Sequence, residues 1–492
     1  MGSISLRNPI AHPCLFFYVL LFVVGFFIIS SQIFPIGARI EVELQNDPRK
    51  EVEFSPVNCT AYSRREKWHS RRGPTIEKEE EDAIGERQNE NTCPEYFQWI
   101  HEDLKPWAGT GITREMVERG RGKATFRLVI VGGRVYVEKY SEVYQRRDIF
   151  TLWGILQLLR WYPDKIPDLD LMFSCEDQPN IFIGNYSGPG PNSMAPPPLF
   201  RYCGDDDTLD IVFPDWSFWG WPEINIKPWE TLMKELKEGN GRKKWINREN
   251  YAYWKGNAFI SMPRYKLLKC SRSTQHDWKA RVYMQDWHKE VKQGFKNSNL
   301  ADQCFSRYKI YIEGIGWSVS LKYILACDSM TLMVKPHFYD FFTRSLVPMH
   351  HYWPIKDDDD MCKSIKFAVE WGNAHKKEAQ AIGKAASKYM EEQLNMEKVY
   401  DYMFHSLNEY SKLLTFKPTI PPNATEISWD DLACPNQGLA AKFMMDTLVK
   451  RPSFSSPCFL LPPFSPIVLD YIRTRKETPI EQIGTWEKNM PL

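Results

Sequence analysis

Net charge is what this 492-residue sequence most clearly lacks: 63 Lys and Arg residues balance 62 Asp and Glu residues, which leaves +1 with neutral histidines. Proteins that bind nucleic acid usually carry a clear positive excess. The composition therefore gives no reason to expect nucleic acid as a partner.

Several short motifs with defined chemistry are also missing. No CxxC pair occurs among the 11 cysteines, which argues against a zinc cluster. Neither a Walker loop nor a complete GxGxxG pattern is present. The segment 316–320 (GWSVS) is superficially similar to a nucleophile elbow, but Ser320 stands where the final glycine is required, so a serine hydrolase is disfavoured. His350 and His351 are adjacent and would point to opposite faces of a strand, which disfavours a shared metal ion.

One long apolar run is present near the N-terminus. Residues 14–29 (CLFFYVLLFVVGFFII) carry no charge, and the apolar character continues to Phe34, roughly the length that crosses a bilayer. Arg7 and the amino terminus precede this run, whereas Glu41, Glu43 and Asp47 accompany Arg39 after it. This charge distribution favours, by a small margin, a cytosolic N-terminus and a lumenal body. No clear small-residue cleavage site follows, so we predict a signal anchor over residues 1–35 rather than a cleaved signal peptide. The expected protein is a single-pass type II membrane protein of the Golgi or endoplasmic reticulum.

Sequons and cysteines agree with a lumenal body. Three N-glycosylation sequons occur, at Asn58, Asn185 and Asn423. Ten cysteines lie outside the apolar run, an even number that favours lumenal disulfides.

The remaining chain divides by composition. Residues 36–92 contain a basic run (RREKWHSRR) and an acidic run (EKEEED) with few apolar residues between them, which predicts a flexible stem. From residue 93 onward, strand and helix patterns alternate, and they include a hairpin signal at Gly132-Gly133. We predict an N-terminal lobe over 93–245, a C-terminal lobe over 246–415 and a Pro-rich extension over 416–492 that wraps the body.

Residues 304–336 have the pattern of a βαβ unit. An alternating strand over 309–313 is followed by Gly314 and Gly316, and Ser318 is placed to cap a helix that ends near Leu325. A buried strand over 330–334 follows. The start of such a helix suits an anion, so a phosphate-bearing ligand is one interpretation, and an ordinary crossover without a ligand is the other.

Three groups of acidic residues are candidates for chemistry. Glu176 and Asp177 follow a strand predicted over 169–174, where a carboxylate can act as a general base on a hydroxyl. An acidic loop is the alternative. The runs 205–207 and 357–360 offer oxygen ligands for a divalent cation, but consecutive acids usually mark exposed loops, and we favour that interpretation for both.

Several ordered motifs together resemble a known family. They are LMFSCEDQP (171–179), DWSFWGWPE (215–223), YAYWKGN (251–257), the segment 301–329 and HYWPIK (351–356). Over roughly residues 93–414 the chain resembles the Rumi-type protein O-glucosyltransferases and the fungal capsule xylosyltransferases of glycosyltransferase family 90. The segment SFWGWPEINIKPW and the Pro-rich C-terminal segment are most similar to the plant branch of this family.

The resemblance implies an α/β fold of the GT-B type, with two Rossmann-like lobes around a central cleft. It also implies an inverting, metal-independent glycosyltransferase that moves glucose or xylose from UDP-glucose or UDP-xylose to a hydroxyl of a protein or polysaccharide acceptor. No cofactor and no metal ligand is expected. The residues that match the family's motifs are Asp177 as general base; Asn257, Arg264, Ile315, Gly316, Trp317, Ser318, Val319 and Ser320 for the donor; Trp216, Phe218, Trp219 and Trp221 on the acceptor side; and Cys304 with Cys327 as a disulfide.

One departure from the family concerns the phosphates. Ser320 stands where the animal glucosyltransferases carry an arginine, and Lys322 follows two residues later. Lysine does not reproduce the bidentate phosphate contact of a guanidinium, so the phosphate contacts of this chain differ from those of its relatives. Two alternatives stay open: a metal-dependent GT-A transferase that uses Asp205 to Asp207, and an inactive lumenal binding protein that keeps the fold.

Overall fold

The computed structural model describes residues 92–186 and 195–489. The predicted anchor, most of the predicted stem and the Asn58 sequon lie outside these residues. Within the described part of the chain, no helix combines the length and the apolar character that a membrane span requires. The prediction of an anchor over 1–35 therefore stays a prediction.

The first sheet is mixed and, within the described residues, contains six strands in the order β11-β2-β1-β3-β4-β5. Its strands are β1 (Phe126–Val131), β2 (Arg134–Lys139), β3 (Leu169–Phe173), β4 (Leu199–Arg201), β5 (Ile211–Val212) and β11 (Thr425–Ile427). β1 and β2 form the predicted hairpin, in which Gly132 and Gly133 have φ values of 58° and 72°. β3, β4 and β5 run parallel, so their carboxyl ends share one edge.

The second sheet is entirely parallel. Within the described residues its order is β10-β9-β8-β6-β7, formed by β6 (Glu249–Gly256), β7 (Ala280–Met284), β8 (Ser306–Tyr311), β9 (Met330–Val334) and β10 (Trp353–Ile355). The first strand, β6, pairs with β7 on one side and with β8 on the other. The strand order therefore reverses between β6 and β8, and in such sheets ligands bind at the carboxyl ends of the strands at this point.

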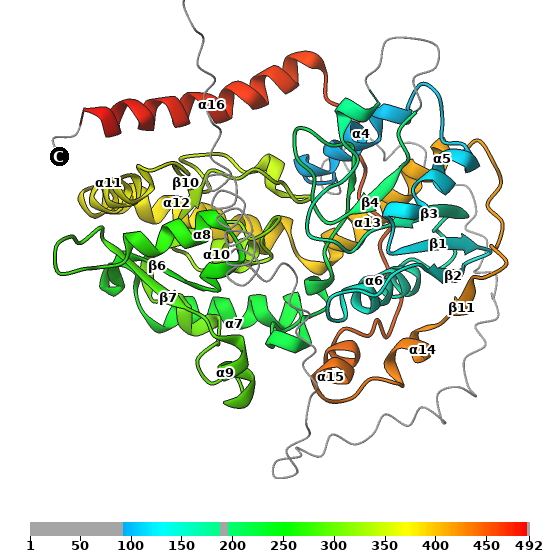
Figure 1. Ribbon diagram of the computed structural model, residues 1–492, viewed down its shortest axis with the longest axis horizontal. Helices are drawn as coiled ribbons and strands as arrows, with labels where there is room; N and C mark the ends of the chain where they lie inside the picture. Colours follow the sequence, from blue (N-terminus) through cyan, green and yellow to red (C-terminus); the bar gives the residue numbers. More distant parts are fainter. Residues whose placement is uncertain (1–91, 187–194, 490–492) are drawn as a thin grey trace, which may run out of the picture. The chain divides into compact units, whose positions relative to one another are not determined.

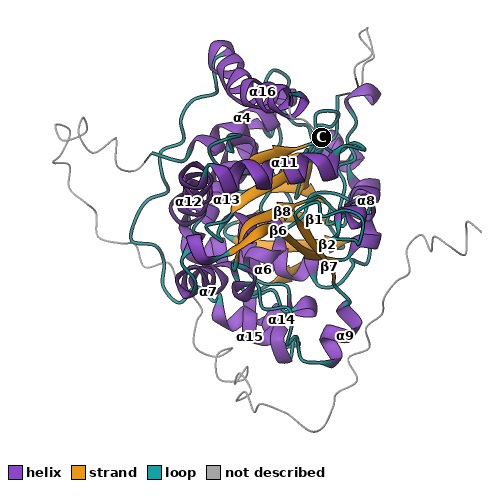
Figure 2. Cartoon of the chain, turned by 90° about the vertical axis from the view of Figure 1, so that its left-hand side faces the viewer, coloured by secondary structure: helices purple, strands orange, loops and turns teal. Residues whose placement is uncertain are grey.

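Helices lie around both sheets (Figure 2). The α-helices of the described residues are α4 (Trp99–Leu104), α5 (Arg114–Arg119), α6 (Arg147–Trp161), α7 (Trp229–Arg242), α8 (Met262–Leu267), α9 (Trp287–Lys292), α10 (Ser320–Leu325), α11 (Met361–Ala374), α12 (Lys376–Gln393), α13 (Met396–Leu413), α14 (Trp429–Ala433), α15 (Gly438–Asp446) and α16 (Pro466–Lys488). α11 packs on β6, β9 and β10, and α12 packs on β9. The predicted α/β class is confirmed.

The predicted βαβ unit of residues 304–336 forms as β8, α10 and β9, but its helix starts later than predicted. α10 begins at Ser320 with Val319 at its N-cap, and no side chain caps it. Ser318 lies one position before the N-cap, where its hydroxyl accepts from the Ser320 N–H at 3.4 Å and also contacts the side chains of Arg264 and Ser320.

The hydrophobic core joins the two predicted lobes. One cluster of buried side chains surrounds the first sheet and also includes Leu321 and Leu325 of α10, Phe341 of the loop after β9, and Met403 of α13. A second cluster fills the space around the second sheet. α10 and α13 thus belong to the C-terminal lobe in sequence but pack into the core of the N-terminal one.

The segment after α13 contacts the surroundings of both sheets. β11 pairs with β2 of the first sheet. α16 then runs past α4 and α11 (Figure 1), where Arg475 pairs with Glu95 at 3.1 Å and Glu487 pairs with Lys356 at 2.7 Å.

Disulfides hold three pairs of distant segments within the described residues. The pairs are Cys93–Cys458, Cys270–Cys362 and Cys304–Cys327, and the last is the one that the family resemblance implies. Cys175 and Cys203 are free and buried, so the expectation that all ten cysteines outside the apolar run form pairs is wrong. Burial raises the pKa of the Cys175 thiol to about 12, which keeps it protonated.

Candidate active site

Asp177 follows the carboxyl end of β3, as predicted. Its Oδ1 atom accepts a hydrogen bond of 2.9 Å from a terminal nitrogen of Arg147, the first residue of α6. The arginine side chain is 8% exposed and the aspartate side chain 34% exposed. The carboxylate is therefore held on one side by a buried cation and open to solvent on the other.

Arg147 was not among the residues predicted from the sequence. Its guanidinium lies 4.5 Å from the ring centre of Trp216, 5.2 Å from that of Tyr144 and 5.8 Å from that of Trp221. The motif that contains Asp177 gives no signal for an arginine 30 residues earlier. Only the packing of α6 beside the end of β3 brings the two side chains together.

Arg264 provides a buried positive charge at the reversal point of the second sheet. Its guanidinium donates to the carbonyl oxygens of Glu313 at 2.8 Å, Ile312 at 3.2 Å and Asn257 at 3.4 Å, and to the Ser318 hydroxyl at 3.1 Å. Among the described residues, no carboxylate oxygen lies within 4.0 Å of it in an ion pair. Burial lowers the pKa of Arg264 from its usual value, because removing the charge from water outweighs the smaller opposing effect of nearby groups that include Glu313.

Asn257 and Arg264 meet at this edge because both follow β6. Asn257 comes directly after the strand, and its Oδ1 atom accepts from the Phe259 N–H at 3.0 Å to cap the short 3₁₀ helix η8 (Ala258–Ile260). Arg264 lies on α8, which follows at once. Two of the predicted donor residues are thus placed at the carboxyl edge, beside the end of β8.

The glycine turn after β8 lies against the loop that carries Asp177. Gln178 donates a 2.9 Å hydrogen bond to the carbonyl oxygen of Ile315. A Cβ atom on Gly316 would lie 1.9 Å from the carbonyl oxygen of Asp177. The predicted base and the predicted donor turn, which belong to different lobes in sequence, are in direct contact.

The rest of the predicted donor segment is partly buried. Trp317 is 6% exposed, and its ring lies 5.5 Å from that of Tyr202 and 6.0 Å from that of Trp216. The Ser318 and Ser320 hydroxyls lie 2.9 Å apart, and Val319 packs against the first core.

The side chain of Lys322 is buried and contacts other protein groups. Its side chain is 2% exposed and pairs with Asp215 at 3.3 Å, and it donates to the Ser217 hydroxyl at 2.6 Å. Asp215 and Ser217 belong to the N-terminal lobe, so this contact links α10 to the other sheet. Arg264, rather than Lys322, is therefore the buried cation beside the glycine turn.

Three of the four residues predicted on the acceptor side lie in the core. Trp216, Phe218 and Trp219 are 2%, 0% and 1% exposed, whereas Trp221 is partly exposed. Trp219 donates to the Tyr400 hydroxyl at 3.1 Å and packs directly on Gly154 of α6. The rings within residues 216–219 fill the space between α6, α7 and α13, and the prediction that they contact the acceptor stays a prediction.

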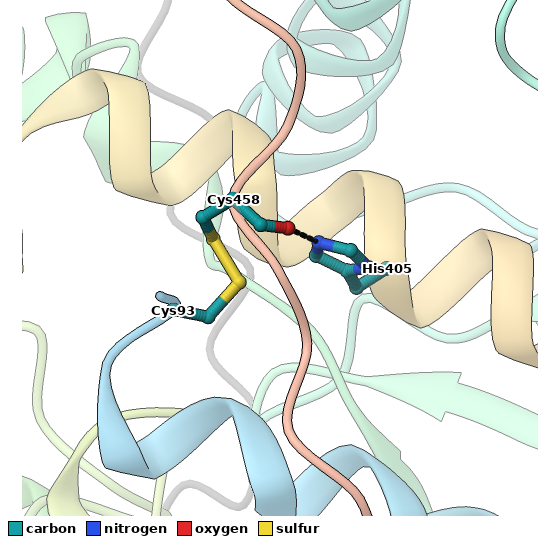
Figure 3. A group of neighbouring side chains, drawn as sticks. All are labelled: Cys93, His405 and Cys458. Atoms are coloured by element: carbon teal, nitrogen blue, oxygen red, sulfur yellow. Dashed lines mark hydrogen bonds between the residues drawn. A yellow bond between two sulfur atoms is a disulfide. The ribbon is translucent and has the colours of Figure 1, made fainter. Parts of the chain in front are cut away.

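The acidic run 205–207 does not converge into a cation site. Among the described residues, the one group of three or more His, Cys, Asp or Glu side chains whose ligand atoms lie within 4.8 Å of one another is Cys93, His405 and Cys458. The two cysteines are joined in a disulfide, and a ring nitrogen of His405 is hydrogen-bonded to the Cys458 carbonyl oxygen (Figure 3). The distance between this nitrogen and the oxygen is 2.8 Å. Sulfurs in a disulfide are not thiolates, which are the form that binds metal.

Two of the three predicted glycosylation sites lie in the described residues. Asn185 and Asn423 are both exposed, as a glycan acceptor requires. The family model described as "Glycosyl transferase family 90" matches residues 88–487. The chain belongs to glycosyl transferase family 90. The resemblance stated from the sequence motifs is confirmed, and the broad activity that it implied, transfer of a glycosyl group, is the activity of the family.

Curated relatives in family 90 cover about two thirds of this chain. Human "Protein O-glucosyltransferase 1" is 25% identical over 345 residues, which are 66% of this chain and 82% of the human protein. "O-glucosyltransferase rumi homolog" of Aedes aegypti is 26% identical over 339 residues, 66% of this chain and 80% of the relative. "O-glucosyltransferase rumi" of Drosophila melanogaster is 24% identical over 341 residues, 67% of this chain and 79% of the relative.

Proposed function

We propose that this family 90 member transfers glucose or xylose from a UDP-sugar to a hydroxyl of a protein or glycan acceptor, with inversion and without a metal ion. Asp177 is the general base. The observation that carries the proposal is the contact of Asp177 and Gln178 with Ile315 and Gly316. The contact supports the proposal because the backbone of Asp177, whose carboxylate is partly exposed, touches the turn that we assign to the donor.

The donor side of the proposal rests on Arg264 and the turn after β8. A diphosphate beside Arg264 would form the direct ion pair that this buried guanidinium does not make with any described carboxylate. The position also coincides with the reversal point of a parallel sheet, where nucleotides bind. The leaving group of the reaction is the UDP diphosphate, and a fixed cation stabilises the charge that develops on it.

The base side of the proposal needs one ionised carboxylate with an accessible oxygen. Arg147 holds Oδ1 of Asp177, and we assign Oδ2 to the acceptor hydroxyl. As the hydroxyl oxygen bonds to the anomeric carbon, its proton passes to Oδ2 and the bond from that carbon to the phosphate oxygen breaks. A single displacement of this kind inverts the anomeric centre.

The printed names of the human and insect relatives favour glucose as the sugar and protein as the acceptor class. Xylose remains the second sugar, from the family resemblance of the sequence motifs. The location that we propose, a type II protein with its catalytic body in the lumen of the Golgi or endoplasmic reticulum, rests on the apolar run of residues 14–29 and on the three sequons.

The test compares the full-length wild-type protein with Asp177→Asn in detergent. Hydrolysis and transfer of UDP-glucose and UDP-xylose are measured with and without EDTA. We expect turnover of one donor that EDTA does not affect and that Asp177→Asn lowers by about 10² to 10⁴-fold, the usual contribution of a general base.

Other outcomes contradict specific parts of the proposal. Turnover that EDTA abolishes would favour a metal-dependent transferase. Binding of a UDP-sugar without any turnover in the wild type would indicate an inactive binding protein. Full activity in Asp177→Asn would show that another group takes the proton.

A further inference from the structure

Arg147 is a buried cation whose partner carboxylate is open to solvent. Other arginine–aspartate pairs of the first lobe are buried on both sides: Arg127 and Asp170 have side chains 5% and 0% exposed, and Arg201 and Asp210 have side chains 1% and 0% exposed. Arg147 is nearly as enclosed as these arginines, but Asp177 is 34% exposed. Arg127 also pairs with Glu118, which is 41% exposed, but it has the fully buried Asp170 as a second partner, whereas Asp177 is the one carboxylate that pairs with Arg147 among the described residues.

Three aromatic rings hold the Arg147 guanidinium in place. The rings are those of Tyr144 before α6 and of Trp216 and Trp221, which come from a loop about 70 residues later in the chain. A guanidinium is attracted to the faces of aromatic rings, most strongly where the contact is removed from water, as it is at the buried Trp216. Trp216 is itself fixed, since its ring lies 5.0 Å from those of both Tyr202 and Trp221. The arginine therefore has little freedom to change its conformation.

We propose that Arg147 is the positioning residue of the catalytic base: it fixes Oδ1 of Asp177 so that Oδ2 faces the acceptor hydroxyl. The inference rests on the proposed function, because it requires Asp177 to be the base. It also gives the aromatic loop a role other than contact with the acceptor, since Trp216 and Trp221 act on the reaction through Arg147.

The step assigns no proton to Arg147. The acceptor proton moves to Oδ2 of Asp177 and then to solvent through the exposed side of the carboxyl group, while Arg147 keeps its charge and its bond to Oδ1. Loss of the arginine leaves the base present but free to rotate. Misplacement of a reacting group by about 1 Å can cost about 10²-fold in rate, so the effect falls on the chemical step rather than on donor binding.

The experiment measures kcat, the donor KM and the melting temperature of the full-length protein with the donor that the wild type turns over. Arg147→Met removes the charge and retains much of the volume, and Arg147→Lys keeps the charge without the planar fork. Arg146→Met is the matched control, because Arg146 precedes Arg147 directly and pairs with Glu223 at 2.6 Å instead of with Asp177.

We expect Arg147→Met to lower kcat at least about tenfold with the donor KM within about twofold of wild type, since the misplaced base affects catalysis and not donor binding. The kcat of Arg147→Lys should lie between those of Arg147→Met and the wild type. The kcat and the donor KM of Arg146→Met should both stay within about twofold of the wild-type values. Added guanidinium ion at millimolar concentration should restore part of the kcat of an Arg147→Ala variant and leave Arg146→Met unchanged.

The outcomes separate the two proposals. Full activity in Asp177→Asn overturns the assigned base and this inference with it. An inactive Asp177→Asn combined with wild-type kcat in Arg147→Met overturns the inference alone. If Arg147→Met does not fold, Tyr144→Leu decides, because Tyr144 is 46% exposed and its loss opens the ring cluster without removing a core side chain. Unchanged kcat in both Tyr144→Leu and Arg147→Lys then overturns the inference.

Discussion

Gly316 lies so close to Asp177 that no other residue fits: a Cβ atom at residue 316 would be 1.9 Å from the Asp177 carbonyl oxygen. The two residues lie in loops that follow strands of different sheets, β3 and β8, and they are 139 positions apart in the sequence. Glycine is required here for the approach of two backbones. The distance between the base and the donor turn is therefore set by the absence of a side chain.

Gly316→Ala should move Asp177 away from the turn. A displacement of about 1 Å or more predicts a loss of about 10²-fold in kcat, together with a lower melting temperature. Steady-state kinetics and a thermal melt check both. Gly122→Ala is the control, because nothing lies within 4 Å of the position that its Cβ atom would take, and it should match the wild type. A wild-type kcat in Gly316→Ala would show that the loops that carry Asp177 and Gly316 can move apart without loss of activity.

Arg264→Met should raise the dissociation constant of the donor at least about tenfold, because the variant loses a hydrogen bond to a charged group. The measurement is the rise in melting temperature that UDP produces, which reports binding to the folded state. Arg248→Met is a matched control: Arg248 is also buried and also bonds to carbonyl oxygens, those of Cys327 at 2.6 Å and Asn240 at 3.2 Å, but it precedes β6 instead of following it. Both variants should lose stability, and only Arg264→Met should lose the response to UDP.

Because of Asp340, the free energy of unfolding should fall as the pH rises from about 4 to about 7. Burial, and then the neighbouring Asp215, raise its pKa to about 7, so the native state keeps a proton that the unfolded state releases near pH 4. The stabilisation from this proton is complete below about pH 4 and is lost as the pH passes about 7. Between pH 5 and pH 8 the loss is roughly 2–3 kcal/mol.

Asp340→Asn should remove that part of the pH dependence. The asparagine stays neutral, and its carbonyl oxygen retains the hydrogen bonds from the backbone N–H groups of Phe342 at 3.2 Å and Thr343 at 3.1 Å. Urea unfolding at pH 5 and pH 8 gives the difference for each protein, and other titrating groups cancel between them. An identical difference in both proteins would contradict the raised pKa.

The Cys304–Cys327 disulfide should stabilise the fold less than the Cys270–Cys362 disulfide does. The first closes 23 residues and the second 92, and the loop-entropy relation gives about 3 and about 5 kcal/mol. Urea unfolding of the two double alanine variants measures both losses. The reverse order would indicate that the bridges act mainly through native contacts rather than through the entropy of the unfolded chain.

Much of the fold could be predicted because its signals are local. The glycine hairpin of β1 and β2, the strand β9 over Met330–Val334 and the helices α11, α12 and α13 each follow from periodicity and turn residues within one segment. Asp177 could be located for a similar reason, since it stands at the end of a buried strand inside a family motif. The predicted N-cap of α10 is one residue too early: Val319 takes that position, and the Ser318 hydroxyl contacts both Arg264 and the Ser320 N–H.

The sequence by itself determined the family, the α/β class, the βαβ unit formed by β8, α10 and β9, and Asp177 as the candidate base. The tertiary structure alone decided that Trp216, Phe218 and Trp219 are core, that Lys322 pairs with Asp215, and that Gly316 touches Asp177. The physical reason is distance along the chain. Lys322 and Asp215 are 107 residues apart and Arg147 and Asp177 are 30 apart, and no local pattern records which side chains meet once the elements pack.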